Sequence, residues 1–469
     1  MTSSSPSHIV IIGGGPGGYV GAIRAAQLGA RVTVVEEGAL GGVCLNSGCI
    51  PSKTLLGFIE LGERVRHAQS HGLKLEGEVG YDLPRMIARK NEVVSGLVKG
   101  IGLLFKQWKI AHVAGRGDLI HDRTVHVRAH DGTESELQAD AIVLATGSSW
   151  PNLPQFPIDG QRVITSREAL DLTDIPRTAL IVGAGVEGCE FASLFSGLGA
   201  QVSMVEMMPT VLPLEDVDTS AVLTRELKKR KVQLFLGTKI LEWSATESGV
   251  RATLETGEEI VADIMLVSIG RRMNSEGLGL ESLGVQLGAR GEILVNERME
   301  TTVPGVYAIG DVTGESMLAH VASAQGKVAV TNAMGGKQVM NYDVIPAGIF
   351  TLPEVGRVGL TEQEATKRGL PVRIGKFRYA GLGKAQAVGE TIGQFKVIAH
   401  AETNIILGVH IIGAHAADLI HEAALGMFGG LQVTELAEMI HAHPTISEGL
   451  MEAAEDLEGL AIHQARKRE

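Results

Sequence analysis

The sequence predicts an α/β fold with two Rossmann-like dinucleotide-binding domains and a C-terminal α+β domain. A repeat is the strongest reason, because residues 9–36 and 179–206 align without a gap. Composition is the second reason: 60 of the 469 residues are glycine, which allows tight turns and close approaches between backbone and ligand. The length agrees, since domains of about 100–200 residues predict two to four of them here.

Each copy of the repeat reads as an apolar strand, a G-x-G-x-x-G turn, a helix and a second strand that ends in glutamate. In this fingerprint the glycines permit the tight turn, the approach of a pyrophosphate and close helix–strand packing, while the acid binds the ribose. Two strand–helix turns without a ligand are the alternative. The residues are Gly13, Gly15, Gly18 and Glu36 in the first copy, and Gly183, Gly185, Gly188 and Glu206 in the second.

The acid of the second copy also bears on cofactor choice. A carboxylate at Glu206 would repel a 2′-phosphate, so the second site is expected to prefer NAD over NADP. An NADP site usually places arginine nearby. Arg271 and Arg272 are distant in the sequence, and their distance in space stays open at this point.

Three later apolar runs are expected to be further strands of the two sheets. They cover residues 139–151, 261–272 and 301–312. Asp311 follows the last of them and could bind a polyol, or it could be a simple turn residue. We therefore expect a first dinucleotide-binding domain over 1–150, a second over 151–273, a central segment over 274–343 that returns to the first, and a C-terminal domain over 344–469.

The remaining composition excludes several classes of function. A formal net charge of -12 argues against nucleic acid as the main ligand. A membrane span would need about 18 apolar residues in a row, and the sequence has no such run. The N-terminus lacks the basic and apolar regions of a signal peptide. A cytoplasmic protein is expected.

Two of the three cysteines, Cys44 and Cys49, lie in the glycine-rich stretch GGVCLNSGCIPSK. Zinc would usually need a second pair of ligands. A structural disulphide that closes so short a loop would add little to the stability of the fold. A redox-active pair remains, and a nearby helix N-terminus is expected to lower a thiol pKa from about 8.5 towards neutrality. Cys189 lies inside the second fingerprint, where a packing role is expected.

Histidines suggest two further sites. His415, Asp418 and His421 have helical spacing, but a packed helix face is favoured and no metal is expected, because no H-E-x-x-H accompanies them. His443 lies in HAHPTISE (441–448). Glu448 could form a capping box with Thr445 or could orient His443, and one carboxylate is not expected to do both in full.

The cysteine stretch, both fingerprints, Ala-Thr-Gly at 145–147, Gly-Asp at 310–311 and HAHPTISE together resemble the dihydrolipoamide dehydrogenases. These belong to the FAD-dependent pyridine nucleotide-disulphide oxidoreductases. The resemblance covers essentially the whole chain. It implies FAD in the first site, NAD in the second, and a homodimer built by the C-terminal domain. It also implies oxidation of protein-bound dihydrolipoyl groups, with hydride passed to NAD, in a 2-oxoacid dehydrogenase or glycine cleavage complex.

The resemblance also assigns roles to residues. Cys44 would exchange with substrate, Cys49 would lie against the flavin, and Lys53 would lie beside it, paired with Glu190. His443, from the partner subunit and before a cis bond to Pro444, would take a substrate proton while Glu448 holds its ring. The implied FAD site further includes Gly115, Thr146, Gly147, Ser148, Asp311, Met317, Leu318, Ala319 and His320, and the implied NAD site includes Glu190 and Gly270.

Departures and alternatives qualify this resemblance. Val43, Ser47 and Gln325 replace residues that are more usual in the family, which bears on rate and flavin potential rather than on reaction type. Glutathione reductase-like enzymes prefer NADP, which Glu206 opposes. Mercuric reductases need a C-terminal cysteine pair, whereas the last cysteine here is Cys189. A non-catalytic flavin dimer that docks in a complex is a further alternative.

Overall fold

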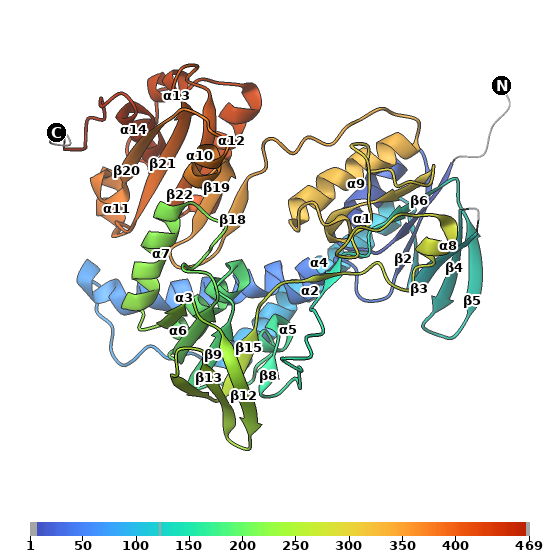
Figure 1. Ribbon diagram of the computed structural model, residues 1–469, viewed down its shortest axis with the longest axis horizontal. Coiled ribbons are helices and arrows are strands. Elements are labelled where there is room, and N and C mark those ends of the chain that lie inside the picture. Colours follow the sequence, from blue (N-terminus) through green and yellow to red (C-terminus); the bar gives the residue numbers. More distant parts are fainter. Residues whose placement is uncertain (1–6, 122, 466–469) are drawn as a thin grey trace. The chain divides into compact units, whose positions relative to one another are not determined.

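The computed structural model describes residues 7–121 and 123–465, and they divide into two compact units. Unit 1 comprises Met1–Leu55, Pro84–Pro157 and Gly270–Asn341. Unit 2 comprises Leu56–Leu83, Ile158–Ile269 and Tyr342–Glu469. Both units appear in Figure 1.

Unit 1 is built on a seven-stranded sheet in the order β17-β6-β1-β2-β3-β4-β5. The five strands from β17 to β3 pair in parallel, and β4 and β5 extend the sheet in antiparallel fashion. The first predicted fingerprint strand is buried throughout. The strands are β1 (His8–Ile12), β2 (Arg31–Glu36), β3 (Ala111–His121), β4 (Thr124–Ala129), β5 (Glu134–Gln138), β6 (Ala141–Leu144) and β17 (Val306–Ala308).

Two helices of unit 1 pack closely through glycine. In α1 (Pro16–Gln27) and α9 (Ala319–Ala333), a Cβ atom on Gly326 would lie 2.5 Å from the carbonyl oxygen of Gly17. The two helices run side by side in Figure 1. The other elements of this unit, or beginning in it, are α2 (Gly42–Ser47), α3 (Cys49–His67), β7 (Ser148–Ser149), β16 (Arg272–Met273), α8 (Leu280–Leu283) and η2 (Gly310–Thr313). The long helix α4 (Leu83–Gln107) belongs almost wholly to unit 1.

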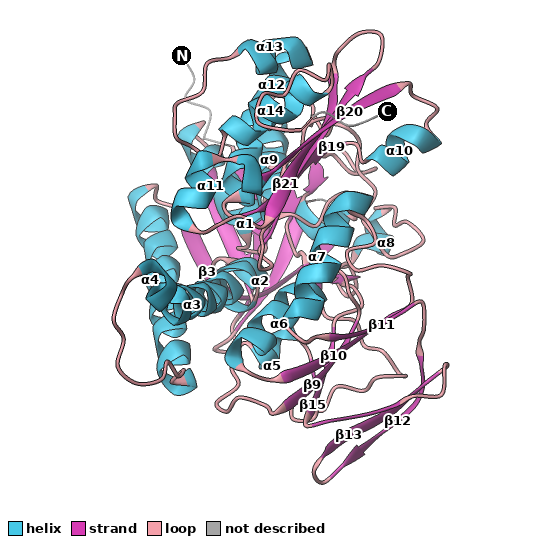
Figure 2. Cartoon of the chain, turned by 90° about the vertical axis from the view of Figure 1, so that its left-hand side faces the viewer, coloured by secondary structure: helices cyan, strands magenta, loops and turns pink. Residues whose placement is uncertain are grey.

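Unit 2 contains the second fingerprint in a five-stranded parallel sheet in the order β11-β10-β9-β15-β8. A three-stranded antiparallel sheet, β12-β13-β14, follows in the chain and is seen in Figure 2. The strands are β8 (Val163–Ile164), β9 (Thr178–Val182), β10 (Gln201–Glu206), β11 (Gln233–Leu236), β12 (Ile240–Thr246), β13 (Gly249–Leu254), β14 (Glu259–Ala262) and β15 (Ile264–Val267). The helices are η1 (Ala68–His71), α5 (Ser166–Ala169), α6 (Val186–Leu198) and α7 (Val217–Lys229).

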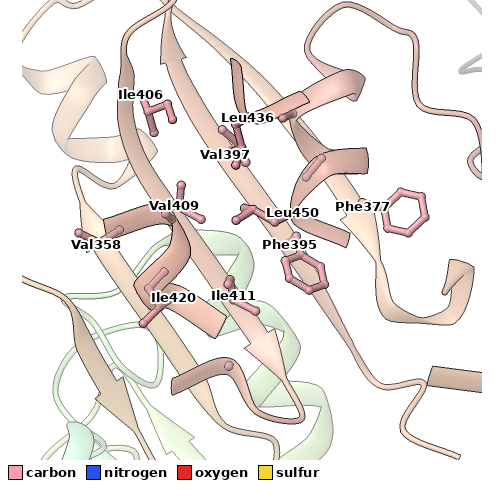
Figure 3. Close-up of a cluster of buried hydrophobic side chains, with 14 of the residues drawn as sticks. Val358, Phe377, Phe395, Val397, Ile406, Val409, Ile411, Ile420, Leu436 and Leu450 are labelled. Atoms are coloured by element: carbon pink, nitrogen blue, oxygen red, sulfur yellow. The ribbon is translucent and has the colours of Figure 1, made fainter. Parts of the chain in front are cut away.

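The C-terminal part of unit 2 is an antiparallel sheet in the order β18-β19-β22-β21-β20. Its buried side chains form a single core with the helices that cover it (Figure 3). The strands are β18 (Ala347–Ile349), β19 (Val355–Gly359), β20 (Val372–Arg378), β21 (Gly393–His400) and β22 (Ile406–Gly413). The helices are α10 (Glu362–Lys367), η3 (Tyr379–Gly381), α11 (Gly383–Val388), α12 (Ala416–Gly429), α13 (Val433–Glu438) and α14 (Glu448–Asp456).

No helix in the described part of the chain is both long enough and apolar enough to cross a membrane.

Candidate active site

The first fingerprint has the backbone geometry that only glycine provides. Gly13 has φ +105°, and a Cβ atom there would lie 2.2 Å from the carbonyl oxygen of Ala145. A Cβ atom on Gly18 would lie 1.9 Å from the carbonyl oxygen of Gly13. Gly15 is the N-cap of α1, and among the described residues no side chain caps that helix end. The turn therefore leaves an N-terminus whose amides and dipole can face a pyrophosphate.

The second fingerprint repeats this geometry. Gly183 has φ +102°, and its Cβ atom would lie 2.2 Å from the carbonyl oxygen of Ser268. A Cβ atom on Gly188 would lie 2.0 Å from the carbonyl oxygen of Gly183. A Cβ atom on Gly185, the N-cap of α6, would meet nothing within 4 Å among the described residues. Both turns thus fit a dinucleotide.

The two terminal glutamates are held by backbone amides in the same way. Glu36 accepts hydrogen bonds from Gly14 N at 2.5 Å and from Gly38 N at 2.6 Å. Glu206 accepts them from Ala184 N at 2.7 Å and from Met208 N at 2.8 Å. Each carboxylate lies at the end of its second strand, beside the turn, where an adenosine ribose would lie.

The strand ends of unit 1 gather polar groups around Asp311. Ser148 Oγ donates a hydrogen bond to Asp311 Oδ2 at 2.5 Å. Arg271 donates to Ser148 Oγ at 2.8 Å and to its carbonyl oxygen at 2.9 Å, and its guanidinium lies over the ring of Trp150. Arg271 is therefore engaged within unit 1, and Arg272 pairs with Glu276. Sequence reasoning missed this use of Arg271 and Trp150, which no local motif signals.

The other residues implied at the first site lie in the same unit. Gly115 lies in β3, where a Cβ atom would be 2.4 Å from the carbonyl oxygen of Arg128. Thr146 donates a hydrogen bond to the carbonyl oxygen of Asn274 at 2.7 Å, and Gly147 has φ +67°. Met317 precedes Leu318, the N-cap of α9, which begins with Ala319 and His320. Gln325 is buried and accepts a hydrogen bond from Gly310 N at 2.7 Å, so it supports the turn before Asp311.

Cys44 lies inside α2 and Cys49 begins α3, on either side of Gly48. Both are free thiols, with Cys44 half-buried in α2 and Cys49 exposed at the start of α3. Cys44 lines a cavity of about 290 Å³ that is mainly apolar, and Ala319 and His320 line it too. Tyr19, Leu97 and Ile101 also line the cavity and were not predicted. The spacing of Leu97 and Ile101 on α4 resembles an ordinary buried helix face.

The pKa of Cys44 differs from the prediction. Its hydrogen bond with Cys49 is the main cause that raises the pKa of the Cys44 thiol, and burial raises it further. Lys53 lies close enough to lower that pKa, but its effect is smaller. The predicted lowering towards neutrality is therefore wrong for Cys44 in the dithiol form, because a thiol bonded to its neighbour keeps its proton.

His443 and Glu448 form a pair at the start of α14. His443 Nδ1 lies 2.8 Å from Glu448 Oε1, and the bond to Pro444 is cis, as the resemblance implied. The second oxygen of Glu448 accepts a hydrogen bond from Thr445 N at 2.7 Å. Each oxygen of Glu448 takes one donor, so the carboxylate contacts both the ring and the amide, but it does not fill both roles in full, as expected. The capping box is incomplete, since Ser447 is the N-cap and the Thr445 hydroxyl donates to the carbonyl oxygen of Ala442.

The charge of Glu448 is stabilised by its neighbours. Burial raises its pKa, but the hydrogen bonds from Thr445 and His443 outweigh burial and place the pKa of Glu448 below its ordinary value. His443 itself is largely exposed, whereas the nearby His441 is buried and lies 2.8 Å from Glu422. An anionic Glu448 can hold the Nδ1 proton of the ring and leave Nε2 to act as a base.

The remaining predicted residues lie as follows. Cys189 is buried in α6 and donates to the carbonyl oxygen of Ala184 at 3.3 Å; burial raises the pKa of this thiol, as expected for a packing residue. Glu190 is buried and accepts a hydrogen bond from Phe350 N at 2.9 Å. Gly270 has φ +116°. The pairing of Lys53 with Glu190 stays a prediction.

Comparisons with known proteins agree with this geometry. Residues 7–326 match the family model described as pyridine nucleotide-disulphide oxidoreductase, and residues 345–454 match the model of its dimerisation domain. Dihydrolipoyl dehydrogenase 1, mitochondrial, of Arabidopsis thaliana is 41% identical over 97% of this chain and 90% of its own length. The dihydrolipoyl dehydrogenase of Thermus scotoductus is 42% identical over 97% of this chain and 98% of its own. The crystal structure of LpdA from Mycobacterium tuberculosis superposes with a TM-score of 0.90 and 31% identity, over 96% of this chain and 99% of LpdA.

Proposed function

Because this chain belongs to the pyridine nucleotide-disulphide oxidoreductase family, we propose that it oxidises dihydrolipoyl groups carried by another protein, as a dihydrolipoyl dehydrogenase. FAD and NAD are its cofactors, and it forms a homodimer. The observation that carries the proposal is the position of Cys44 in the wall of an apolar cavity, hydrogen-bonded to Cys49.

The first fingerprint and the cluster around Asp311 would hold FAD, and the second fingerprint would hold NAD. Glu36 would bind the adenosine ribose of FAD and Glu206 that of NAD, since both are fixed by amides beside their turns. Bound there, FAD would supply two-electron redox chemistry between the cysteine pair and NAD. The chain itself supplies the binding, the thiols and the proton acceptor.

The thiol chemistry begins with the oxidised enzyme, in which Cys44 and Cys49 form a disulphide. A substrate thiolate attacks Cys44 Sγ, a mixed disulphide forms, and Cys49 leaves as a thiolate. The second substrate thiol then attacks the substrate sulphur of the mixed disulphide. The cyclic lipoyl disulphide is released and Cys44 is reduced, so two electrons have moved from substrate to the cysteine pair. Lys53, close to Cys44, favours the thiolate form.

His443 would accept the proton of the attacking substrate thiol. Its Nδ1 is held by an anionic Glu448, which leaves Nε2 to take the proton and stabilises the resulting imidazolium. We propose that the partner's His443 serves the cavity of this chain, so the dimer is needed for turnover. The C-terminal residues 345–454 that match the dimerisation model contain His443.

The cavity favours a lipoyl group over more polar disulphides. Leu45, Ile50, Leu97 and Ile101 contribute apolar walls, and an apolar dithiolane gains from burial there while a charged tripeptide such as glutathione loses hydration. We propose that the lipoyl groups are those of a 2-oxoacid dehydrogenase or glycine cleavage complex, and that the enzyme works in the cytoplasm, where its cysteine pair cycles in a reducing environment.

The test replaces the proposed base. His443→Gln is expected to lose turnover of dihydrolipoamide with NAD by about 10²–10⁴-fold, the usual contribution of a general base, while FAD content stays that of the wild type. His130→Gln, at an exposed histidine of unit 1, is the matched control and should keep full turnover. Near-wild-type oxidation by the His443 variant would refute the role of this residue.

Thiol titration separates the enzyme from a non-catalytic flavin dimer. Adding NADH to the oxidised protein should expose two titratable thiols at Cys44 and Cys49 and produce a long-wavelength charge-transfer absorbance. A dimer that only docks in a complex would show neither change.

A further inference from the structure

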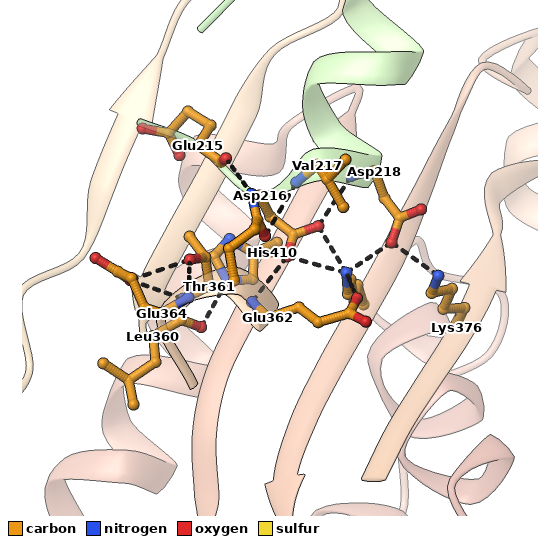
Figure 4. A network of polar contacts seen from close by, with 12 residues as sticks. Glu215, Asp216, Val217, Asp218, Leu360, Thr361, Glu362, Glu364, Lys376 and His410 are labelled. Atoms are coloured by element: carbon orange, nitrogen blue, oxygen red, sulfur yellow. Dashed lines mark hydrogen bonds and ion pairs between the residues drawn. The ribbon is translucent and has the colours of Figure 1, made fainter. Parts of the chain in front are cut away.

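A buried lysine lies at the centre of a charged cluster in unit 2. Lys396, in the middle of β21, is 1% exposed and contacts three carboxylates. Its Nζ lies 2.7 and 2.9 Å from the two oxygens of Asp216, 2.6 Å from Asp218 and 2.6 Å from Glu362. Figure 4 shows these acids converging from α7 and α10. The cluster thus ties the C-terminal sheet to the helix that follows the second fingerprint.

Stability alone is a weak reason for such a cluster. Burial lowers the pKa of Lys396, but its hydrogen bonds with Asp216, Asp218 and Glu362 outweigh burial and keep the lysine charged. Buried ion pairs are costly to desolvate, and apolar side chains of similar volume often stabilise a fold equally well. What a buried charged group does supply is a fixed geometry for its partners.

Asp216 is the most tightly held carboxylate of the cluster. It is fully buried and caps α7, where its side chain accepts a hydrogen bond from Asp218 N at 3.0 Å. The same carboxylate accepts a hydrogen bond from Glu362 N at 3.1 Å. With its two contacts to Lys396, Asp216 is fixed from three elements at once, so the first turn of α7 has little freedom to move.

The first turn of α7 is connected to the second fingerprint in two steps. Ser220 Oγ in α7 donates a hydrogen bond to the carbonyl oxygen of Leu212 at 3.1 Å. Leu212 N in turn donates to the carbonyl oxygen of Ala184 at 2.8 Å. Ala184 is the middle residue of the Gly183–Gly185 turn, and its own N–H holds Glu206. The charged cluster therefore lies at one end of a short chain of hydrogen bonds that ends at the NAD turn.

We propose that Lys396 is a positioning residue for NAD: through Asp216 and the start of α7 it fixes the Ala184 turn and the carboxylate of Glu206. The inference rests on the assignment of the second fingerprint to NAD. It extends the NAD site to a residue on the C-terminal sheet, nearly two hundred positions away in the sequence.

The test weakens the cluster while keeping the fold. Asp216→Asn keeps the size of the side chain and the helix cap but removes the charge that Lys396 faces, and Lys396→Met removes the lysine. Both variants are expected to bind NAD about tenfold more weakly in titrations of the oxidised holoenzyme. Amide hydrogen exchange at Ala184 and Leu212, measured without NAD, should accelerate by a similar factor. Reduction of the enzyme by dihydrolipoamide alone should stay within about twofold of the wild type.

Glu63→Gln is the matched control. It breaks the bidentate ion pair between Glu63 and Arg230, and Arg230 lies at the C-terminal end of α7, opposite the end that Asp216 caps. It should leave NAD affinity and exchange at Ala184 within about twofold of the wild type. Wild-type NAD affinity in Asp216→Asn, or an equal loss in Glu63→Gln, would overturn the proposal. If the wild-type holoenzyme does not bind NAD at all, the cofactor assignment fails instead, and the exchange measurement still decides whether Lys396 positions this turn.

Discussion

The two fingerprints have the same turn but differ in what supports its middle residue. In the first copy the carbonyl oxygen of Gly14 accepts a hydrogen bond from Gly41 N at 2.8 Å, and in the second that of Ala184 accepts one from Leu212 N at 2.8 Å. Both donors have a left-handed backbone, with φ +99° at Gly41 and +46° at Leu212. In both copies, therefore, the chain that follows the second strand returns to the turn and donates a hydrogen bond to its middle residue.

The extensions lead to different chemistry. Gly41 is the N-cap of α2, which carries Cys44 three residues later, so the first turn is followed directly by the thiol proposed to react. Leu212 leads to Asp216, α7 and the buried Lys396 cluster. The first copy thus leads to the proposed reacting group, whereas the second leads to the cluster proposed to position NAD.

The largest effect is expected at the first copy. Cys44→Ser removes the sulphur proposed to exchange with substrate, so dihydrolipoamide oxidation should fall by more than about 10³-fold, the scale on which loss of a nucleophile acts. NADH should still reduce the enzyme-bound FAD, because the second copy is intact. Stopped-flow absorbance resolves the two reactions. If the Cys44→Ser variant still oxidised dihydrolipoamide, the proposed difference in role between the two fingerprint copies would be wrong.

Matched alanine substitutions in the two turns should separate the cofactors. Gly13→Ala and Gly183→Ala each place a Cβ atom about as close to a carbonyl oxygen, 2.2 Å in both cases, and each forces a left-handed alanine that costs about 1–3 kcal/mol. The first variant should purify with little FAD, while the second should keep FAD and lose NAD affinity. Flavin absorbance and NAD titration measure the two outcomes. Loss of FAD from both variants would contradict the assignment of one cofactor to each turn.

Local patterns predicted these turns because the constraint is local. A glycine that cannot carry a Cβ and an acid at the end of the next strand lie within one stretch of 28 residues, so the repeat reports them directly. The Lys396 cluster was beyond sequence reasoning, because Asp216 lies 180 positions away and an isolated lysine in a strand has no distinctive neighbours. The division of the two Glu448 oxygens between His443 and Thr445 was also beyond it, since it depends on which oxygen faces which donor.

A smaller effect is expected from the acid of the second copy. Glu206→Ala removes the predicted ribose ligand and the acceptor for Ala184 N and Met208 N, so the KM for NAD should rise about tenfold. The preference for NAD over NADP should become smaller, because the variant lacks the negative charge that would repel a 2′-phosphate. Glu36→Ala is the control and should affect FAD content instead. An unchanged ratio of the two KM values would show that Glu206 does not select the cofactor.

The smallest effect is a contrast in pH dependence between two histidines, one in each unit. In unit 1, burial lowers the pKa of His8, so its contribution is present above about pH 6.5 and is lost as the pH falls through the folded-state pKa. In unit 2, the hydrogen bond with Glu422 raises the pKa of His441 against burial. Its contribution is present below about pH 6.5 and is lost as the pH rises through the folded-state pKa.

Thermal unfolding of His8→Gln and His441→Gln between about pH 5 and 8 measures this contrast. The loss in stability relative to wild type, of the order of 1 kcal/mol, should grow with pH for His8 and shrink with pH for His441. Glu422→Gln should reproduce the His441 profile. Slopes of the same sign for both histidines would contradict the opposite environments of His8 and His441.

The two hydrogen bonds of Glu448 determine what its replacement by glutamine would do. An ionised carboxyl group is symmetric and offers an acceptor on each side, which suits the ring of His443 and the amide of Thr445 together. A glutamine of identical shape has one acceptor and one donor, so with its oxygen on the Thr445 amide it would point an NH₂ group at His443 Nδ1. The ring accepts that hydrogen bond only as the tautomer protonated at Nε2, and that tautomer has no free Nε2 lone pair with which to take a substrate proton. Shape alone therefore does not make a substitution neutral at this position.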